Sequence, residues 1–112
     1  MSGTPLAVRI LGSGSSGGVP RIGSDGPDWG ACDPTNPKNR RRRCSILVRR
    51  GKTGILVDTS PDMSRQLIDA RCGRLDAVLF THDHADQSHG IDDLRMVAQN
   101  MRRRVPVYGD RA

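Results

Sequence analysis

The stretch THDHADQSHG, residues 81–90, decides the fold class of this chain and the chemistry expected of it. It holds all three histidines of the protein. It directly follows LDAVLF, an apolar run at residues 75–80 that predicts a short buried strand. In an extended chain, alternate residues point to the same side. His82, His84 and Asp86 are spaced by two, so their side chains would converge on one point.

Two imidazoles and a carboxylate form a ligand set that suits Zn²⁺, Mn²⁺ or iron. The alternative interpretation is a polar loop in which histidines occur by chance. Three histidines within eight residues, with none elsewhere in the chain, favour the metal site.

Length and composition bound the class of protein. The chain has 112 residues, enough for one domain. Only 35% of them are apolar and 3% aromatic, so the core must be aliphatic. No apolar run approaches the ~20 residues that span a bilayer, and the first residues do not resemble a signal peptide. Three cysteines without CxxC spacing argue against a disulfide framework and favour a cytoplasmic location.

The charge pattern points to anionic partners. The net charge is +6, and four consecutive arginines occupy positions 40–43, which favours a phosphate or a nucleic acid. A solvated basic loop explains the same run equally well. Aromatic residues do not alternate with the basic ones, so a stacking platform for single strands is not indicated. A nucleic acid is therefore the less favoured partner, and no membrane partner is expected.

The remaining sequence predicts an alternation of strands and helices around one long loop. Residues 12–43 are rich in Gly, Pro, Ser and Arg and show no periodicity. Ser60 and Pro61 predict a helix start, with Gly73 ending that helix. Asp92 and Asp93 fall in the first turn of a second predicted helix, where they complement its dipole. The expected elements are strands at 6–11, 44–50, 53–58, 75–80 and 105–109, a turn at 51–52, a helix after 60 carrying Met63, Leu67 and Ile68 on its apolar face, and a helix at 91–102.

A glycine motif follows the first strand. Gly12, Gly14 and Gly17 satisfy GxGxxG, but the prolines and glycines of VPRIGSDGPDWG forbid the helix that a dinucleotide site needs. No Gly-Lys-Ser/Thr is present for a P-loop. What remains is a loop whose backbone approaches something closely, either the phosphate of a ligand or a neighbouring strand.

THDHADQ resembles the T-H-x-H-x-D-H signature of the metallo-β-lactamase fold hydrolases. LGSGSSGGVPRIG, WGACDPTNPKNRRRRCSILV, ILVDTSPDMSRQLI and HGIDDLR resemble the opening half of the branch that contains the phosphoribosyl cyclic phosphodiesterases. The resemblance implies an α/β fold, the four-layer αββα sandwich with a metal site at the sheet edge. Residues 1–112 would then form the N-terminal part of a single such domain, about its first half.

The resemblance also implies roles for individual residues. His82 and His84 match ligands of the first metal, and Asp86 matches a ligand of the second and is the assigned catalytic residue. Asp58 matches the acidic residue that braces the metal loop, although a strand-end turn former explains it equally well. Gln87 stands where the family most often has a histidine ligand. His89 is expected to support the ligands without contacting the metal. Three explanations of Gln87 remain open: Gln87 binds the metal weakly, His89 takes its place as a ligand, or the second metal site is partly filled or holds a different metal.

The function implied is a metal-dependent hydrolase that uses a metal-activated water on a small, cyclic phosphodiester or nucleotide-like substrate, with one or two Zn²⁺ or Mn²⁺ ions. The glycine loop would receive the phosphate through Gly14, Ser15, Ser16 and Gly17. The alternatives are a non-catalytic metal- or nucleotide-binding fragment and an RNA-processing nuclease of the same superfamily. Further metal ligands of the family have no counterpart after His89. The 112-residue chain alone is therefore expected to be inactive and to self-associate or form a homodimer through an uncovered sheet.

Overall fold

The computed structural model describes residues 4–81 and 88–109. They form a five-stranded mixed sheet with the order β1-β4-β5-β6-β7. The β4–β5 hairpin turns at Gly51, where φ is +60°, as the sequence predicted. β1 and β4 pair antiparallel, whereas β5, β6 and β7 run parallel to one another. The strands are β1 (Leu6–Gly12), β4 (Ser45–Arg50), β5 (Thr53–Val57), β6 (Ala77–Phe80) and β7 (Val107–Gly109).

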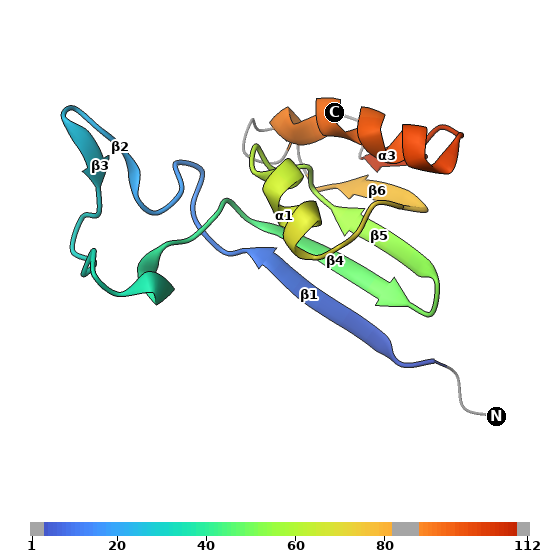
Figure 1. Cartoon of the computed structure of the whole chain (residues 1–112), viewed down its shortest axis with the longest axis horizontal. Coiled ribbons are helices and arrows are strands. Elements are labelled where there is room, and N and C mark those ends of the chain that lie inside the picture. The colour runs from blue at the N-terminus through green and yellow to red at the C-terminus, as the bar shows by residue number, and fades with distance from the viewer. Residues whose placement is uncertain (1–3, 82–87, 110–112) are drawn as a thin grey trace.

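Helices cover one face of this sheet (Figure 1). They are α1 (Met63–Asp69), the 3₁₀ helix η2 (His89–Asp93) and α3 (Leu94–Met101). The core lies between these helices and the sheet, because alternate strand residues point towards the helices. Its buried members are Leu47, Leu56, Met63, Leu67, Ala70, Leu75, Val78, Leu94 and Val97. None of the helices described is long and apolar enough to cross a bilayer.

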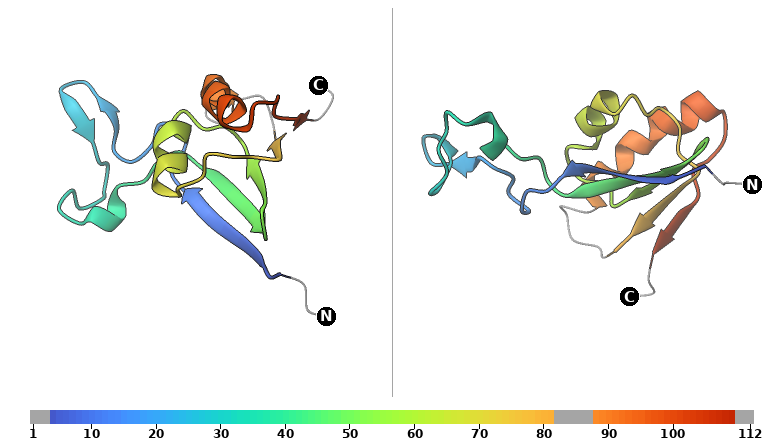
Figure 2. Two further views of the ribbon diagram at one scale, coloured as in Figure 1. Left: turned by 45° about the vertical axis from the view of Figure 1, so that its right-hand side comes forward. Right: turned by 90° about the horizontal axis from the view of Figure 1, so that it is seen from below.

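No described helix covers the opposite face of the sheet (Figure 2), and apolar side chains are exposed there. On β1, Leu6, Val8 and Ile10 are all more than half exposed. Val8 pairs with Val48, and Val48 pairs with Ile55, so the apolar surface continues across three strands. The described residues thus form a helix layer on a sheet layer, which corresponds to one αβ half of the predicted αββα sandwich.

The predicted long loop is not without structure. Residues 12–43 contain a small hairpin, β2 (Arg21–Gly23) with β3 (Gly26–Asp28), and a 3₁₀ turn, η1 (Pro37–Asn39). This segment projects away from the sheet (Figure 1). The hairpin strands are only three residues long and mostly exposed, so no apolar periodicity marked them in the sequence.

The first predicted helix is shorter than expected. It begins at Met63 rather than Pro61, because residues 60–63 form a tight turn in which the Met63 N–H donates to the Ser60 carbonyl at 3.0 Å. It ends at Asp69 rather than Gly73, because Arg71 adopts the left-handed conformation with φ of +53°. Ile68, predicted on the apolar face, is 70% exposed.

The second predicted helix, 91–102, is divided into η2 and α3. Gly90 lies directly against the backbone of Ser60, and a Cβ at this position would collide with the Ser60 carbonyl oxygen. This close approach fixes the chain at the start of η2, and a 3₁₀ turn connects it to the α-helix. Asp92 lies in the first turn of η2 and Asp93 in the N-cap position of α3, with no side-chain cap hydrogen bond at either helix.

Candidate functional site

Three connecting segments meet at one edge of the sheet. β1 runs parallel to β5, because each pairs antiparallel with β4, and β5 pairs parallel with β6. The carboxyl ends of these three strands therefore lie at the same edge. The glycine loop follows β1, Asp58 follows β5, and Thr81 with the histidine stretch follows β6. The segments that follow β1, β5 and β6 thus meet at the sheet edge, which is where the sequence predicted a metal site.

Asp58 holds the start of the histidine stretch. Its carboxylate is buried and accepts two hydrogen bonds from Thr81, one from the backbone N–H and one from the hydroxyl, both at 2.8 Å. Its own N–H donates to Leu79 at 2.8 Å, and its φ is +64°. Asp58 therefore turns the chain at the strand end and holds Thr81, whereas its predicted role of bracing a metal loop stays a prediction. Both carboxylate oxygens accept from Thr81.

The other end of the histidine stretch is anchored to the same short segment. The Gly90 N–H donates to the carbonyl of Thr59 at 3.0 Å, and the side chains of Thr59 and Ser60 are fully buried. Residues 58–60 therefore hold both flanks of the stretch. His89 lies at the first position of η2 with its side chain exposed. Its predicted role behind the ligands stays a prediction.

The predicted ligands His82, His84, Asp86 and Gln87 lie outside the described residues. Within residues 4–81 and 88–109, no three His, Cys, Asp or Glu side chains gather as a metal site would require. Cys32, Cys44 and Cys72 form no disulfide. The donor chemistry fits a metal nonetheless, because a run of two imidazoles and a carboxylate starts one residue after Thr81, whose position Asp58 fixes with two hydrogen bonds.

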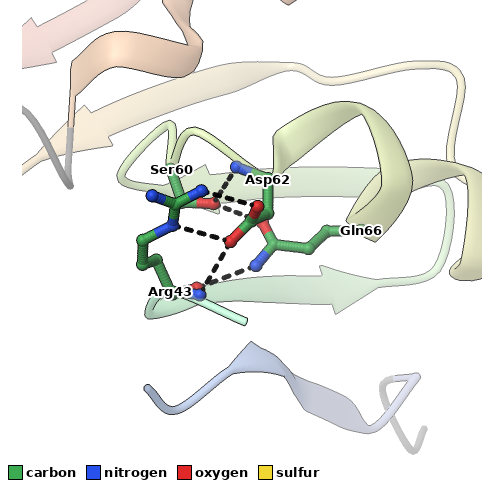
Figure 3. A network of polar contacts seen from close by, with 4 residues as sticks. All are labelled: Arg43, Ser60, Asp62 and Gln66. Carbon is green, nitrogen blue, oxygen red and sulfur yellow. Dashed lines mark hydrogen bonds and ion pairs between the residues drawn. The ribbon is translucent and has the colours of Figure 1, made fainter. Parts of the chain in front are cut away.

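A polar network connects the arginine run to this edge (Figure 3). The Arg43 guanidinium donates to both carboxylate oxygens of Asp62 at 2.9 Å, and the Arg43 N–H donates to the same carboxylate. The Gln66 amide donates to the Arg43 carbonyl at 2.8 Å and accepts from the Ser60 hydroxyl at 2.7 Å. Hydrogen bonds from the Arg43 side chain hold the pKa of Asp62 below its usual range, against the opposing effect of burial.

Sequence reasoning missed this network. The arginines look like a charge run, and Asp62 looks like an ordinary residue near a helix start. The pairing joins residues 19 positions apart, so no local pattern could show it. The only signal in the sequence was the density of arginines at 40–43.

The glycine loop makes its close approach to the arginine run that precedes β4. The Gly14 N–H donates to the Arg42 carbonyl at 2.7 Å, and a Cβ on Gly12 would collide with the Arg43 carbonyl oxygen. Gly14 is buried, so its N–H is not available to a phosphate in this arrangement. The other predicted phosphate-binding residues, Ser15, Ser16 and Gly17, are exposed beside it.

Residues 53–112, more than half of the chain, match the family described as the Beta-lactamase superfamily domain. The chain belongs to this superfamily. The fold agrees, because a solved diphosphatase of the PhnP family is 36% identical and superposes with a TM-score of 0.80, over 93% of this chain and 42% of that one. Zn²⁺-bound PqqB from Methylobacterium extorquens shares the fold at 20% identity, with a TM-score of 0.56, over 92% of this chain and 45% of its own.

Two further relatives are 40% identical to this chain over smaller shares of their own length. An octanoyltransferase of Porphyromonas gingivalis is 40% identical over 103 residues, which is 90% of this chain and 20% of that protein. A ribonuclease Z of Bradyrhizobium is 40% identical over 60 residues, which is 52% of this chain and 20% of that protein. The chain thus spans about a fifth of these relatives and under half of the solved structures. The names of these proteins differ too much to define one substrate.

Proposed function

We propose that this superfamily member is a metal-dependent phosphodiesterase that acts on a small, cyclic or nucleotide-like phosphodiester. The observation that carries the proposal is the double hydrogen bond from Thr81 to the buried Asp58 carboxylate. These hydrogen bonds fix Thr81, the residue before the predicted ligands, at the sheet edge where the arginine run 40–43 also lies.

The metal would be held by His82, His84 and Asp86, with Zn²⁺ or Mn²⁺ as the ions that suit this donor set. When bound, it would supply Lewis-acid activation of a water and neutralise charge on the phosphate. Asp58 would act through Thr81, by restricting the backbone from which the ligands project. Gln87 offers a neutral amide oxygen where an imidazole is usual, so a second ion would bind more weakly than the first.

Charge supports a phosphate rather than a neutral substrate. The sequence carries a net charge of +6, and the arginine run lies beside the glycine loop at the same sheet edge. Guanidinium groups bind phosphate oxygens through paired donors. The likeness to a diphosphatase agrees with this choice.

A ribonuclease of the same superfamily is the second candidate. The 40% identity with a ribonuclease Z over 60 residues, about half of this chain, favours it. Against it, the chain has few aromatic side chains on which single-stranded bases could stack. A non-catalytic, metal-binding role is the remaining alternative from the sequence.

The test is hydrolysis of bis(4-nitrophenyl) phosphate by the full-length gene product loaded with Zn²⁺ or Mn²⁺. We expect turnover that is lost when His82→Ala and His84→Ala are combined and retained when the exposed Arg95→Ala is made. Gln87→His should raise uptake of a second equivalent of metal. Hydrolysis of a β-lactam without diesterase activity would overturn the proposal. Metal uptake without turnover of either substrate would favour the non-catalytic role.

A further inference from the structure

The arginine run and the glycine loop enclose a pocket of about 430 Å³ at the sheet edge. Gly17–Pro20 form one wall, Arg40–Arg43 form the second, and Asp62 and Arg65 close the pocket from the α1 side. None of these residues is a predicted metal ligand. We call this space the arginine pocket.

The arginine pocket has more positive charge than its own acids neutralise. Arg43 is paired with Asp62, and Arg42 is paired with Asp69 at 2.6 Å. Among the described residues, the other three arginines, Arg40, Arg41 and Arg65, have no carboxylate partner. Arg40 lies over the Trp29 ring at 5.2 Å from its centre, and Arg41 donates to the hydroxyl of Ser13 at 2.7 Å. Arg40, Arg41 and Arg65 thus contribute to the lining of one concave space without a carboxylate that neutralises them, and this excess of positive charge favours an anion there.

The backbone holds the pocket open in a fixed shape. Val19 and Arg41 exchange two backbone hydrogen bonds, at 2.9 and 2.7 Å, which join the two walls. Arg43 is clamped to Asp62, which joins the second wall to α1 (Figure 3). An anion would therefore meet backbone walls that are already in place, and only the side chains of the unpaired arginines would need to be ordered around it.

The donor chemistry selects the ligand. Guanidinium groups present planar, paired N–H donors that match the oxygens of a phosphate. The single acid in the lining, Asp62, already accepts three hydrogen bonds from Arg43, so its charge is compensated. We propose that the arginine pocket is a binding site for a compact phosphate-bearing anion of the pyrophosphate type, centred on Arg40, Arg41 and Arg65. This inference rests on the proposed function, which takes the same arginine run to favour a phosphate, and adds a binding site that needs no metal.

The test is calorimetric titration of the metal-free 112-residue chain with inorganic pyrophosphate in the presence of a chelator. The pocket variant combines Arg41→Gln with Arg65→Gln. The matched control combines Arg9→Gln with Arg95→Gln, which removes the same charge from exposed positions outside the pocket. We expect saturable binding that weakens about tenfold or more in the pocket variant and about twofold or less in the control. Circular dichroism confirms that both variants are folded.

Three results would overturn the inference. The first is no saturable binding of pyrophosphate by the parent chain, and the second is equal weakening in the pocket variant and the control, which would mean a general charge effect. The third is tight binding of a single-stranded oligonucleotide that pyrophosphate does not displace and that the pocket variant and the control weaken equally. This result would mean that the basic residues form an extended nucleic-acid surface. The variant with His82→Ala and His84→Ala should bind pyrophosphate as the parent does. Failure of the metal site and failure of the arginine pocket are thereby separated.

Discussion

The two faces of the sheet are built from the same strands and have opposite surroundings. Leu56 of β5 points to the helix layer and is fully buried, whereas Leu6 of β1 points to the other side and is 65% exposed. Both faces are aliphatic, yet only one is covered by described residues. An antiparallel sheet with one solvated face normally has polar residues there. The sheet therefore has the sequence of a layer that is covered on both sides.

The largest expected effect tests the covered face. Leu56→Ala should lower the free energy of unfolding by about 2–5 kcal/mol, because it removes a fully buried side chain and leaves a cavity. Leu6→Ala, the same change on the open face, should cost less than about 1 kcal/mol, because much of that side chain is already in water. Urea denaturation at low protein concentration measures both. Equal losses would contradict the difference between the faces.

A smaller effect is expected at the polar contacts of the sheet edge. Asp62→Asn should cost about 1–2 kcal/mol at pH 7, since it removes charge-assisted hydrogen bonds from Arg43 at a partly buried position. The matched control is Asp28→Asn, which breaks the ion pair with Arg21 on the projecting hairpin and should have little effect. Thermal denaturation compares them, and a larger loss in the control would contradict the role of the Arg43 network.

The cost of Asp62→Asn should also depend on pH. The folded-state pKa of Asp62 is lowered, chiefly by hydrogen bonds from Arg43. Its stabilisation is therefore fully present above the unfolded value of about 3.9 and is lost as the pH falls through the lower, folded value. The stability gap between parent and variant should stay constant from pH 7 to about 5 and shrink below about pH 4. A gap that grows on acidification would contradict this account.

The smallest effect on stability, but a clear one on association, is expected at the open face. Val8→Thr combined with Ile10→Thr keeps the strand shape and makes the face more polar. Self-association of the chain, seen by sedimentation, and fluorescence of a hydrophobic dye should both fall about twofold or more. The control combines Ile22→Thr with Ile68→Thr, two exposed side chains away from this face. Equal decreases in both variants would mean that the open face is not the associating surface.

Local patterns in the sequence predicted most of the sheet. The β4–β5 hairpin, β1 and β6 were found from their apolar runs, although β1, which the sequence predicted to be buried, has Leu6, Val8 and Ile10 more than half exposed. The ends of α1 were wrong, since the turn at residues 60–63 and the left-handed conformation of Arg71 shorten the helix at positions where no glycine or other local signal marks them. The short β2–β3 hairpin was missed because its strands bury almost nothing.

The candidate site was predicted only in part, for the same reason. Asp58 was singled out by the resemblance to the metallo-β-lactamase fold hydrolases, and the structure shows its hydrogen bonds to Thr81. The arginine pocket needed the fold, because it joins residues 17–20, 40–43 and 62–65. No periodicity within any one of these segments indicates that they meet.

The most direct test of the central claim is the zinc content of the purified 112-residue chain after dialysis at neutral pH, measured by elemental analysis. We predict stoichiometric zinc in the parent, and none in the variant that combines His82→Ala with His84→Ala. Asp58→Asn should give an intermediate value, because the amide nitrogen cannot accept one of the two Thr81 hydrogen bonds. Equal zinc in the parent and the double histidine variant would contradict the metal site at the sheet edge.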